Sequence, residues 1–109
     1  MQPQKRIIKT YIHAGKNFFD VWLNSLQDVE GSTAVARRIA RASEGNFGDH
    51  RAVGGGVLEL RVHCGPGYRV YYGEDGPVIV LLICAGTKNS QKRDIRLAKR
   101  LWQEYRRTI

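Results

Sequence analysis

The sequence has few cysteines and no long apolar run. Its 109 residues include two cysteines, Cys64 and Cys84, and no Cys-x-x-Cys pair or Cys/His ligand spacing, which argues against a metal site. No apolar run approaches the roughly 20 residues of a transmembrane helix. The basic N-terminal stretch, MQPQKRIIKTYIHAGK, lacks the apolar segment of a secretory signal. We therefore expect a cytoplasmic protein with reduced thiols, no metal, no cofactor and no association with membranes.

Acidic residues are also few. Lysine and arginine number 18 against 10 aspartates and glutamates, which gives a formal net charge of +8. A charge of this size on a small chain favours nucleic acid, an acidic protein or an anionic membrane surface as the partner. The apolar fraction of 42% is typical of a globular protein, and the length suits one core rather than two. We expect a single domain over residues 1–109.

The spacing of apolar residues predicts an α+β fold. Residues 5–12 mix β-branched, aromatic and charged residues and indicate a first strand near a sheet edge, and residues 16–29 and 33–44 have helical spacing. Residues 45–56 are rich in turn residues, with room for a short strand at 50–53. The remaining expected elements are strands over 57–63, 68–73 and 78–85, a loop over 86–90 and a helix over 91–107. This order predicts helices grouped apart from an antiparallel sheet.

Residues 57–72, VLELRVHCGPGYRVYY, carry the clearest functional signal. Arg61 and Arg69 lie on two expected strands, where guanidinium groups make a fixed anion-binding surface. A four-residue loop that pairs His63 with Tyr68 would place the two arginines on opposite sheet faces. A loop of three or five residues, or a glycine bulge, would place them on one face. We expect the shared face.

Other candidates surround this hairpin. Glu59, Arg61 and His63 alternate onto one strand face. Tyr71 and Tyr72 must split between the two faces, so one of the rings is free to stack on a base. Basic side chains follow the last strand and open the last helix. The residues assigned to substrate binding are Glu59, His63, Tyr71, Arg51, Lys92 and Arg93.

Simpler interpretations of these residues remain open. Arg69 can serve as an exposed arginine that only keeps the sheet soluble, and Lys88 as an ordinary loop lysine. Glu59 can be the partner in a surface ion pair, which contributes little stability. His63 can be a residue of the sheet rim, and the basic face of the last helix can be merely solvated.

Four motifs recur together in one family: Phe19-x-x-Trp-Leu23, GNFGDHRAVGGGVLELR, GPGYRVYY and GTKNSQKRDI. With them, the chain resembles the addiction-module killer proteins, a HigB-like branch of the RelE/ParE toxin superfamily, from about residue 8 to residue 104. The resemblance implies a small antiparallel sheet with two N-terminal helices packed on it and a C-terminal helix. It also implies the toxin of a type II toxin–antitoxin pair. RelE-like members cleave messenger RNA, usually in the ribosomal A site, and ParE-like members poison DNA gyrase.

The resemblance implies catalytic roles for three residues. Arg69 occupies the place of the catalytic-face arginine in the YR-x-x-Y strand of RelE-like toxins. Arg61 matches a basic residue that recurs on the preceding strand, and Lys88 matches a basic residue just after the last strand. The chain departs from the pattern early in the last helix, where Asp94 and its neighbours replace a tyrosine, and it has no histidine beside Lys88.

Our leading hypothesis is an endoribonuclease that inhibits translation, with the ribosome positioning the messenger. In this chemistry the 2′-hydroxyl attacks the adjacent phosphorus, and fixed cations stabilise the charge that builds on the phosphoryl oxygens. Arginine hardly ever deprotonates, which leaves Glu59, His63 and Lys88 as the candidate acid or base. The first alternative is a gyrase inhibitor that binds through its basic C-terminal helix without nuclease chemistry. The second is a nucleic-acid-binding domain without toxicity.

Either toxin hypothesis implies an antitoxin. We expect a partner from the adjacent gene with a helix-turn-helix domain, so that contact with operator DNA occurs only through the antitoxin. The nuclease hypothesis adds messenger RNA and the ribosome as partners. The positive field of the chain would speed association with an acidic antitoxin segment.

Overall fold

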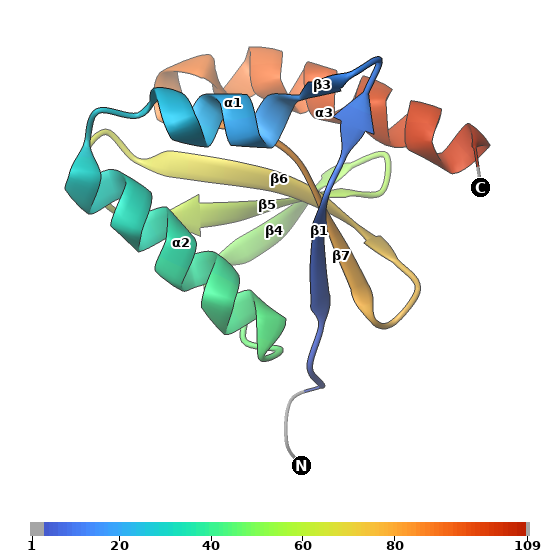
Figure 1. Cartoon of the computed structure of the whole chain (residues 1–109), viewed down its shortest axis with the longest axis horizontal. Coiled ribbons are helices and arrows are strands. Elements are labelled where there is room, and N and C mark those ends of the chain that lie inside the picture. Colours follow the sequence, from blue (N-terminus) through green and yellow to red (C-terminus); the bar gives the residue numbers. More distant parts are fainter. Residues whose placement is uncertain (1–3, 109) are drawn as a thin grey trace.

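Five strands form the central sheet of the computed structural model, which describes residues 4–108. Their order across the sheet is β1-β7-β6-β5-β4 (Figure 1). Neighbours from β4 to β7 are antiparallel, whereas β1 runs parallel beside β7, with Ile7 opposite Ile79. The strands are β1 (Ile7–Thr10), β4 (His50–Gly54), β5 (Val57–Val62), β6 (Tyr68–Asp75) and β7 (Ile79–Thr87).

The α+β class and the edge position of the first strand are therefore confirmed, but the fully antiparallel sheet is wrong. The sheet is mixed because β1 covers the open edge of β7, the most apolar strand. A small second hairpin, β2 (Ile12–His13) with β3 (Lys16–Asn17), follows β1. No helix among residues 4–108 combines the length and apolar character needed to cross a membrane.

The first two helices are shifted from their expected ranges. Helix α1 (Phe18–Ser25) is shorter than the expected 16–29, since the Asn17 side chain caps it by accepting a hydrogen bond from Asp20 N at 3.0 Å. Helix α2 (Val29–Ser43) begins four residues early, because Asp28 caps it by accepting from Gly31 N at 3.0 Å. Gly31 and Ser32, which lie between the two expected helical ranges, instead belong to the first turn of α2.

Gly31 has a packing role in that turn. A Cβ at this position would lie 2.5 Å from Tyr68 Cε2 on β6, so the missing side chain lets α2 approach the sheet. The final helix, α3 (Gln91–Arg107), matches its expected range, and a short 3₁₀ helix, η1 (Lys88–Ser90), replaces part of the expected loop.

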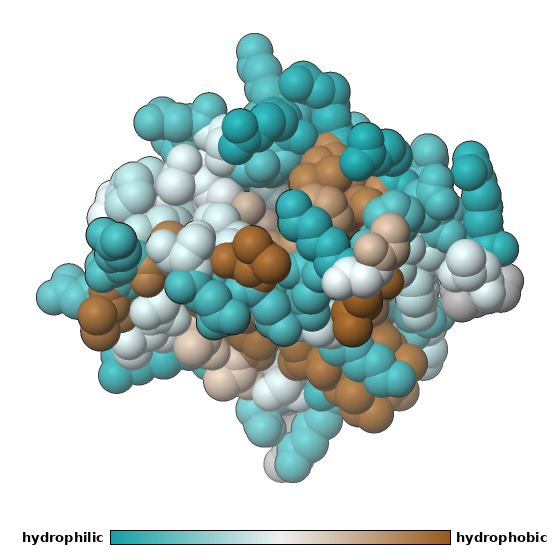
Figure 2. Space-filling view, turned by 45° about the horizontal axis from the view of Figure 1, so that its top comes forward, coloured by the Kyte–Doolittle hydropathy of each residue, from teal (hydrophilic) through white to brown (hydrophobic). Residues whose placement is uncertain are grey.

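The core has two parts, one on each face of the sheet. Side chains of α1 and α2 pack with one set of strand residues, including Leu60 and Val70. Side chains of α3, among them Leu101 and Trp102, pack with the alternate set, including Ile83. In Figure 1, α3 passes behind α1 across the top of the sheet. Figure 2 shows a mostly hydrophilic face with smaller hydrophobic areas between the hydrophilic side chains.

Candidate functional site

The register of the β5–β6 hairpin places the two arginines on one face. Val62 pairs with Tyr68 and Arg61 pairs directly with Arg69, so the connecting loop is the five-residue segment 63–67. Directly paired residues point to the same side of an antiparallel sheet. The expected shared face is confirmed, and it is the face that α3 covers in part.

A buried carboxylate lies at the centre of this face. Glu59 on β5 is 0% exposed, and its Oε1 accepts hydrogen bonds from Arg51 Nε and Arg61 Nε, each at 3.1 Å. Its Oε2 lies 3.7 Å from Arg69 Nε. We call Arg51, Arg61 and Arg69 the arginine cluster. Each of its members comes from a different strand, β4, β5 and β6, so the sheet register fixes their spacing.

Two uncharged groups complete the contacts of Glu59. Tyr71 Oη donates to Oε2 at 3.1 Å, and Gln91 Nε2, from the first turn of α3, donates to the same oxygen at 2.8 Å. Burial pushes the pKa of Glu59 upward, but the hydrogen bonds from Gln91, the arginines and Tyr71 outweigh it and hold this pKa below its ordinary value. Glu59 is therefore a carboxylate at neutral pH, paired and hydrogen-bonded as a buried charge must be.

The cluster keeps a surplus of positive charge. Three guanidinium groups face one carboxylate, and the side chains of Arg51, Arg61 and Arg69 are 50%, 30% and 13% exposed. Arg69 Nε is buried and has no hydrogen-bond acceptor among residues 4–108. A Cβ at Gly67 would lie 3.3 Å from a terminal guanidinium nitrogen of Arg69, so this glycine leaves room for the guanidinium group. The surplus cations lie at the surface, where an anion can reach them.

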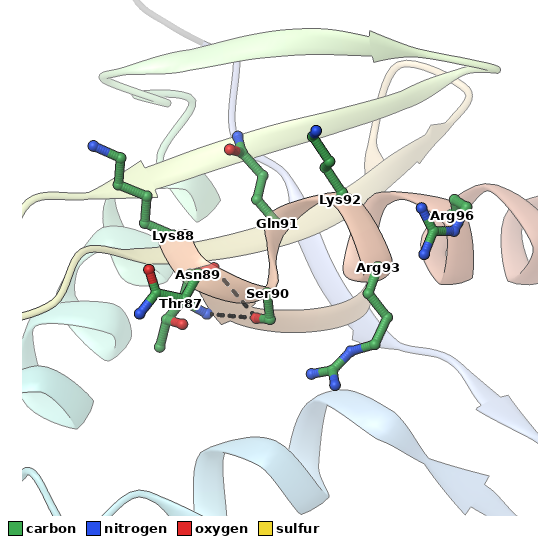
Figure 3. Close-up of a pocket in the computed structure, with 8 residues that line it drawn as sticks. All are labelled: Thr87, Lys88, Asn89, Ser90, Gln91, Lys92, Arg93 and Arg96. Atoms are coloured by element: carbon green, nitrogen blue, oxygen red, sulfur yellow. Dashed lines mark hydrogen bonds between the residues drawn. The ribbon is translucent and has the colours of Figure 1, made fainter.

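A second basic region adjoins the cluster. The N-terminal turn of α3 and the η1 segment surround an open hollow of about 560 Å³ (Figure 3). Lys88 N donates to Gly67 O at 3.0 Å, which ties the hollow to the hairpin loop that precedes Arg69. Gln91 joins the two regions, since it lines the hollow and also binds Glu59. The lining residues are Thr87, Lys88, Asn89, Ser90, Gln91, Lys92, Arg93 and Arg96.

The side chains of the hollow point two ways. In Figure 3, Lys88, Gln91 and Lys92 extend to the same side of η1 and α3, whereas Arg93 extends to the opposite side. Arg93 and Arg96 also line a neighbouring hollow of about 430 Å³ further along α3. The fold therefore brings Lys88 and Lys92 to one side and separates them from Arg93.

A buried acid fixes the start of α3 against the sheet. Asp94 is 6% exposed, and its Oδ2 accepts a hydrogen bond from Ser90 Oγ at 2.5 Å. A Cβ at Gly86 would lie 1.9 Å from the same oxygen, so only glycine fits beneath it. Asp94 therefore has a structural role at the start of α3.

Three residues assigned to substrate binding, Glu59, Tyr71 and His63, are not placed to contact a substrate at the arginine cluster. Glu59 and Tyr71 are both 0% exposed, and a buried side chain makes no direct contact with a substrate. Tyr72 is 2% exposed, so neither tyrosine offers a ring for base stacking. His63 lies apart from Glu59, because its Nε2 contacts Asp49 Oδ2 at 2.6 Å.

His63 belongs to a hollow beside α2. This space of about 310 Å³ is also lined by Ala34, Val62 and three arginines of α2, Arg37, Arg38 and Arg41. Arg38 is structural, since it donates hydrogen bonds to the backbone oxygens of Arg61, Phe47 and Asp49. The strand alternation that would align His63 with Arg61 ends at Val62, the last residue of β5.

Gln91 is the site residue that the sequence did not reveal. It lies within the GTKNSQKRDI motif, which was the only signal, and an amide at a helix start is typically read as solvent-exposed. Among residues 4–108, no group of three or more His, Cys, Asp or Glu side chains is arranged to hold a metal ion.

Comparison with known proteins identifies a bacterial relative. The chain is 44% identical over 86 residues to an uncharacterized protein of Haemophilus influenzae (strain ATCC 51907 / DSM 11121 / KW20 / Rd). The match covers 79% of this chain and 87% of the relative. No family model matches the sequence. Identity of this level over nearly the whole relative establishes common descent, and the chain belongs to the same family as this Haemophilus influenzae protein.

Proposed function

We propose that this chain is the toxin of a type II toxin–antitoxin system and inhibits translation by cleaving messenger RNA. The observation that carries the proposal is the pair of directly opposed arginines, Arg61 and Arg69, on a sheet face with surplus positive charge. The resemblance of its motifs to RelE-like toxins supports the same function. The phosphate backbone of RNA is the polyanion that such a face suits.

The cleavage uses the RNA itself as the nucleophile. The 2′-hydroxyl attacks the adjacent phosphorus, the bond to the 5′-oxygen breaks, and the products are a 2′,3′-cyclic phosphate and a 5′-hydroxyl. Charge on the phosphoryl oxygens is greatest in the transition state, where Arg61 and Arg69 bind it more strongly than in the ground state. Arg51, with half of its side chain exposed, holds a flanking phosphate.

Lys88 is the proton donor in this proposal. Glu59 is buried and occupied by its hydrogen bonds, and His63 lies in the hollow beside α2. Lys88 is exposed, and its backbone is tied to the loop that precedes Arg69. Its ammonium group gives a proton to the departing 5′-oxygen, and water takes the proton of the 2′-hydroxyl. Lys92, on the same side of α3, binds the RNA backbone.

The proposal includes an antitoxin from the adjacent gene and a cytoplasmic site of action on the ribosome. The antitoxin carries a helix-turn-helix domain, and operator DNA is bound through it alone. An acidic antitoxin segment that covers Arg61 and Arg69 would block access of RNA to them. The net charge of +8 favours fast association with such a segment.

Expression in bacteria without the antitoxin tests this function. Wild-type protein should arrest growth within one or two generations and produce new 5′ ends inside coding sequences, mapped by sequencing. Arg69→Ala should relieve the arrest, whereas Arg107→Ala, an exposed arginine at the end of α3, should not. Growth arrest by wild type with intact messenger RNA would exclude the nuclease.

Gyrase inhibition is the second candidate. The observation in its favour is the exposed basic face of α3, where Arg93, Arg96 and Arg100 line one hollow with Leu97. A gyrase poison causes a DNA damage response and leaves messenger RNA unchanged. The same expression experiment separates the two functions when a damage-response reporter is included.

A further inference from the structure

We propose that Glu59 is a positioning residue: its buried carboxylate fixes Arg51 and Arg61 through hydrogen bonds and lies beside Arg69, so that the arginines keep the geometry that binds the reacting phosphate. The inference deepens the proposed function and rests on it for its catalytic part. It assigns Glu59 neither to substrate contact nor to proton transfer. Gln91 is a second positioning residue, since its hydrogen bond from α3 fixes the orientation of the Glu59 carboxylate.

The two carboxylate oxygens of Glu59 bind different groups. Oε1 accepts from Arg51 and Arg61, and Oε2 accepts from Tyr71 and Gln91 while facing Arg69 at 3.7 Å. Both oxygens are therefore committed. A carboxylate bound on both oxygens cannot turn, so the two guanidinium groups that are hydrogen-bonded to it, those of Arg51 and Arg61, keep one orientation.

Glu59 binds two of the arginines through one atom of each guanidinium group. Arg51 and Arg61 each bind Glu59 through Nε, and among residues 4–108 their terminal nitrogens donate no hydrogen bond to Glu59. The two terminal nitrogens of each guanidinium group remain for a phosphate, which they bind through parallel hydrogen bonds. Holding an arginine by Nε orients the donors that it presents to the substrate.

The burial of the Glu59 carboxylate carries a cost in free energy. A carboxylate with no exposed surface is expensive to bury, and replacement of such an ionic group by an apolar one often leaves a protein as stable or more stable. Two fully exposed arginines would bind RNA without it, and the negative charge of Glu59 weakens the attraction of the face for phosphate. What the carboxylate adds is a fixed orientation of the arginine side chains.

Substitution of Glu59 by Gln separates geometry from charge. Glu59→Gln raises the net charge by one, so electrostatics alone predicts tighter RNA binding and equal or faster cleavage. If Glu59 positions the arginines, the chemical step should instead become slower in this variant. We expect the affinity for a 12-nucleotide single-stranded RNA, measured by fluorescence anisotropy, to be unchanged or higher. Single-turnover cleavage should fall by about 10- to 100-fold, the scale of a misplaced catalytic group.

Gln91→Ala is the second variant, because it removes one hydrogen bond to Glu59 and leaves the core intact. It should lower the cleavage rate by a smaller factor without weakening RNA binding. Gln103→Ala, at an exposed position of the same helix, is the matched control and should change neither quantity. Glu59→Asp, which keeps the charge on a shorter side chain, should recover part of the rate that Glu59→Gln loses. Thermal unfolding of every variant checks that the fold persists.

The arrangement itself is tested without nuclease activity by NMR of the arginine Nε–H groups. In wild type, two slowly exchanging Nε–H signals should disappear in Arg51→Lys and Arg61→Lys respectively, and Glu59→Gln should shift both signals and speed their exchange. Unchanged Nε–H signals in Glu59→Gln, or wild-type cleavage by this variant, would overturn the proposal. If wild type cleaves no RNA, the proposed function fails, and the NMR result alone still decides whether Glu59 orients the arginines.

Discussion

Arg61 and Arg69 stand directly opposite each other on β5 and β6, and the same buried carboxylate, Glu59, lies beside both. Two like charges at directly paired strand positions repel one another. Glu59, two residues before Arg61 on β5 and on the same face of the sheet, offsets this repulsion, and the surplus positive charge remains available to an anion. This relationship makes the hairpin a phosphate-binding surface of defined geometry.

The three arginines should contribute unequally to cleavage. Arg69 is the least exposed, and its guanidinium group lies against the hairpin loop, so Arg69→Ala should lower the single-turnover rate by about 10²- to 10³-fold, the range for loss of one transition-state donor. Arg51→Ala should lower it by less than about 10-fold, because half of that side chain is already in solvent. Equal losses in the two variants would contradict this ranking.

Stability should fall at acidic pH through Glu59. Its pKa is lower in the folded chain than in the unfolded chain, so the unfolded chain takes up a proton first as the pH falls below about 5. The stabilisation is complete above the unfolded pKa and is lost as the pH falls through the folded pKa. The free energy of unfolding, from urea titrations at pH 7, 5, 4 and 3, should drop more steeply for wild type than for Glu59→Gln.

Other carboxyl groups do not obscure that comparison. Hydrogen bonds from Tyr68 and His63 lower the pKa values of Asp28 and Asp49 respectively, but both groups are present in wild type and in the variant. Their contributions cancel in the difference between the two pH profiles. Parallel profiles would show that Glu59 is not a carboxylate stabilised by the fold.

The link between α2 and the sheet gives a third prediction. Tyr68 Oη donates to Asp28 Oδ2 at 2.6 Å, and this bond raises the pKa of Tyr68 to about 12. Tyr68→Phe should lower the urea midpoint at pH 7, and Asp28→Asn should lower it too. In a double-mutant cycle the two losses should not add, because each substitution removes the hydrogen bond from the Tyr68 hydroxyl to the Asp28 carboxylate. Strictly additive losses would show that the bond contributes nothing.

The seat of Trp102 on the sheet gives a fourth prediction. A Cβ at Gly73 would lie 2.3 Å from Trp102 Cζ3, so Gly73→Ala should destabilise the protein by about 1–3 kcal/mol, as overpacking does. Trp102→Leu in the same chain should reduce that cost. Gly76, whose added Cβ would meet nothing within 4 Å, is the control, and the cost of Gly76→Ala should not depend on residue 102.

Local patterns in the sequence predicted much of this fold. The strands from β5 to β7 and helix α3 lie within a few residues of their expected ranges, since their apolar spacing and turn residues are local signals. The parallel pairing of β1 with β7 joins distant parts of the chain, and no local pattern encodes it. Helix α2 starts four residues before its expected first residue, because the Asp28 side chain caps it by accepting a hydrogen bond from Gly31 N.

The basic residues of the candidate site could be predicted from the sequence, whereas the buried carboxylate at its centre could not. Arg61, Arg69 and Lys88 stand in recognisable motifs, and the five-residue loop places both arginines on one face as expected. An acid between apolar strand residues suggests an exposed position, yet Glu59 is fully buried. Its burial depends on partners from β4, β6 and α3 that only the folded chain assembles, Gln91 among them.

The termini of the RNA fragments decide whether this chain cleaves messenger RNA by attack of the 2′-hydroxyl. Purified protein is added to ribosomes that carry a defined messenger, and the cleavage products are mapped and their termini identified. Our account predicts an upstream fragment that ends in a 2′,3′-cyclic phosphate or 3′-phosphate and a downstream fragment with a 5′-hydroxyl, formed by wild type and lost in Arg69→Ala. Fragments with a 3′-hydroxyl and a 5′-phosphate, or an intact messenger, would contradict it.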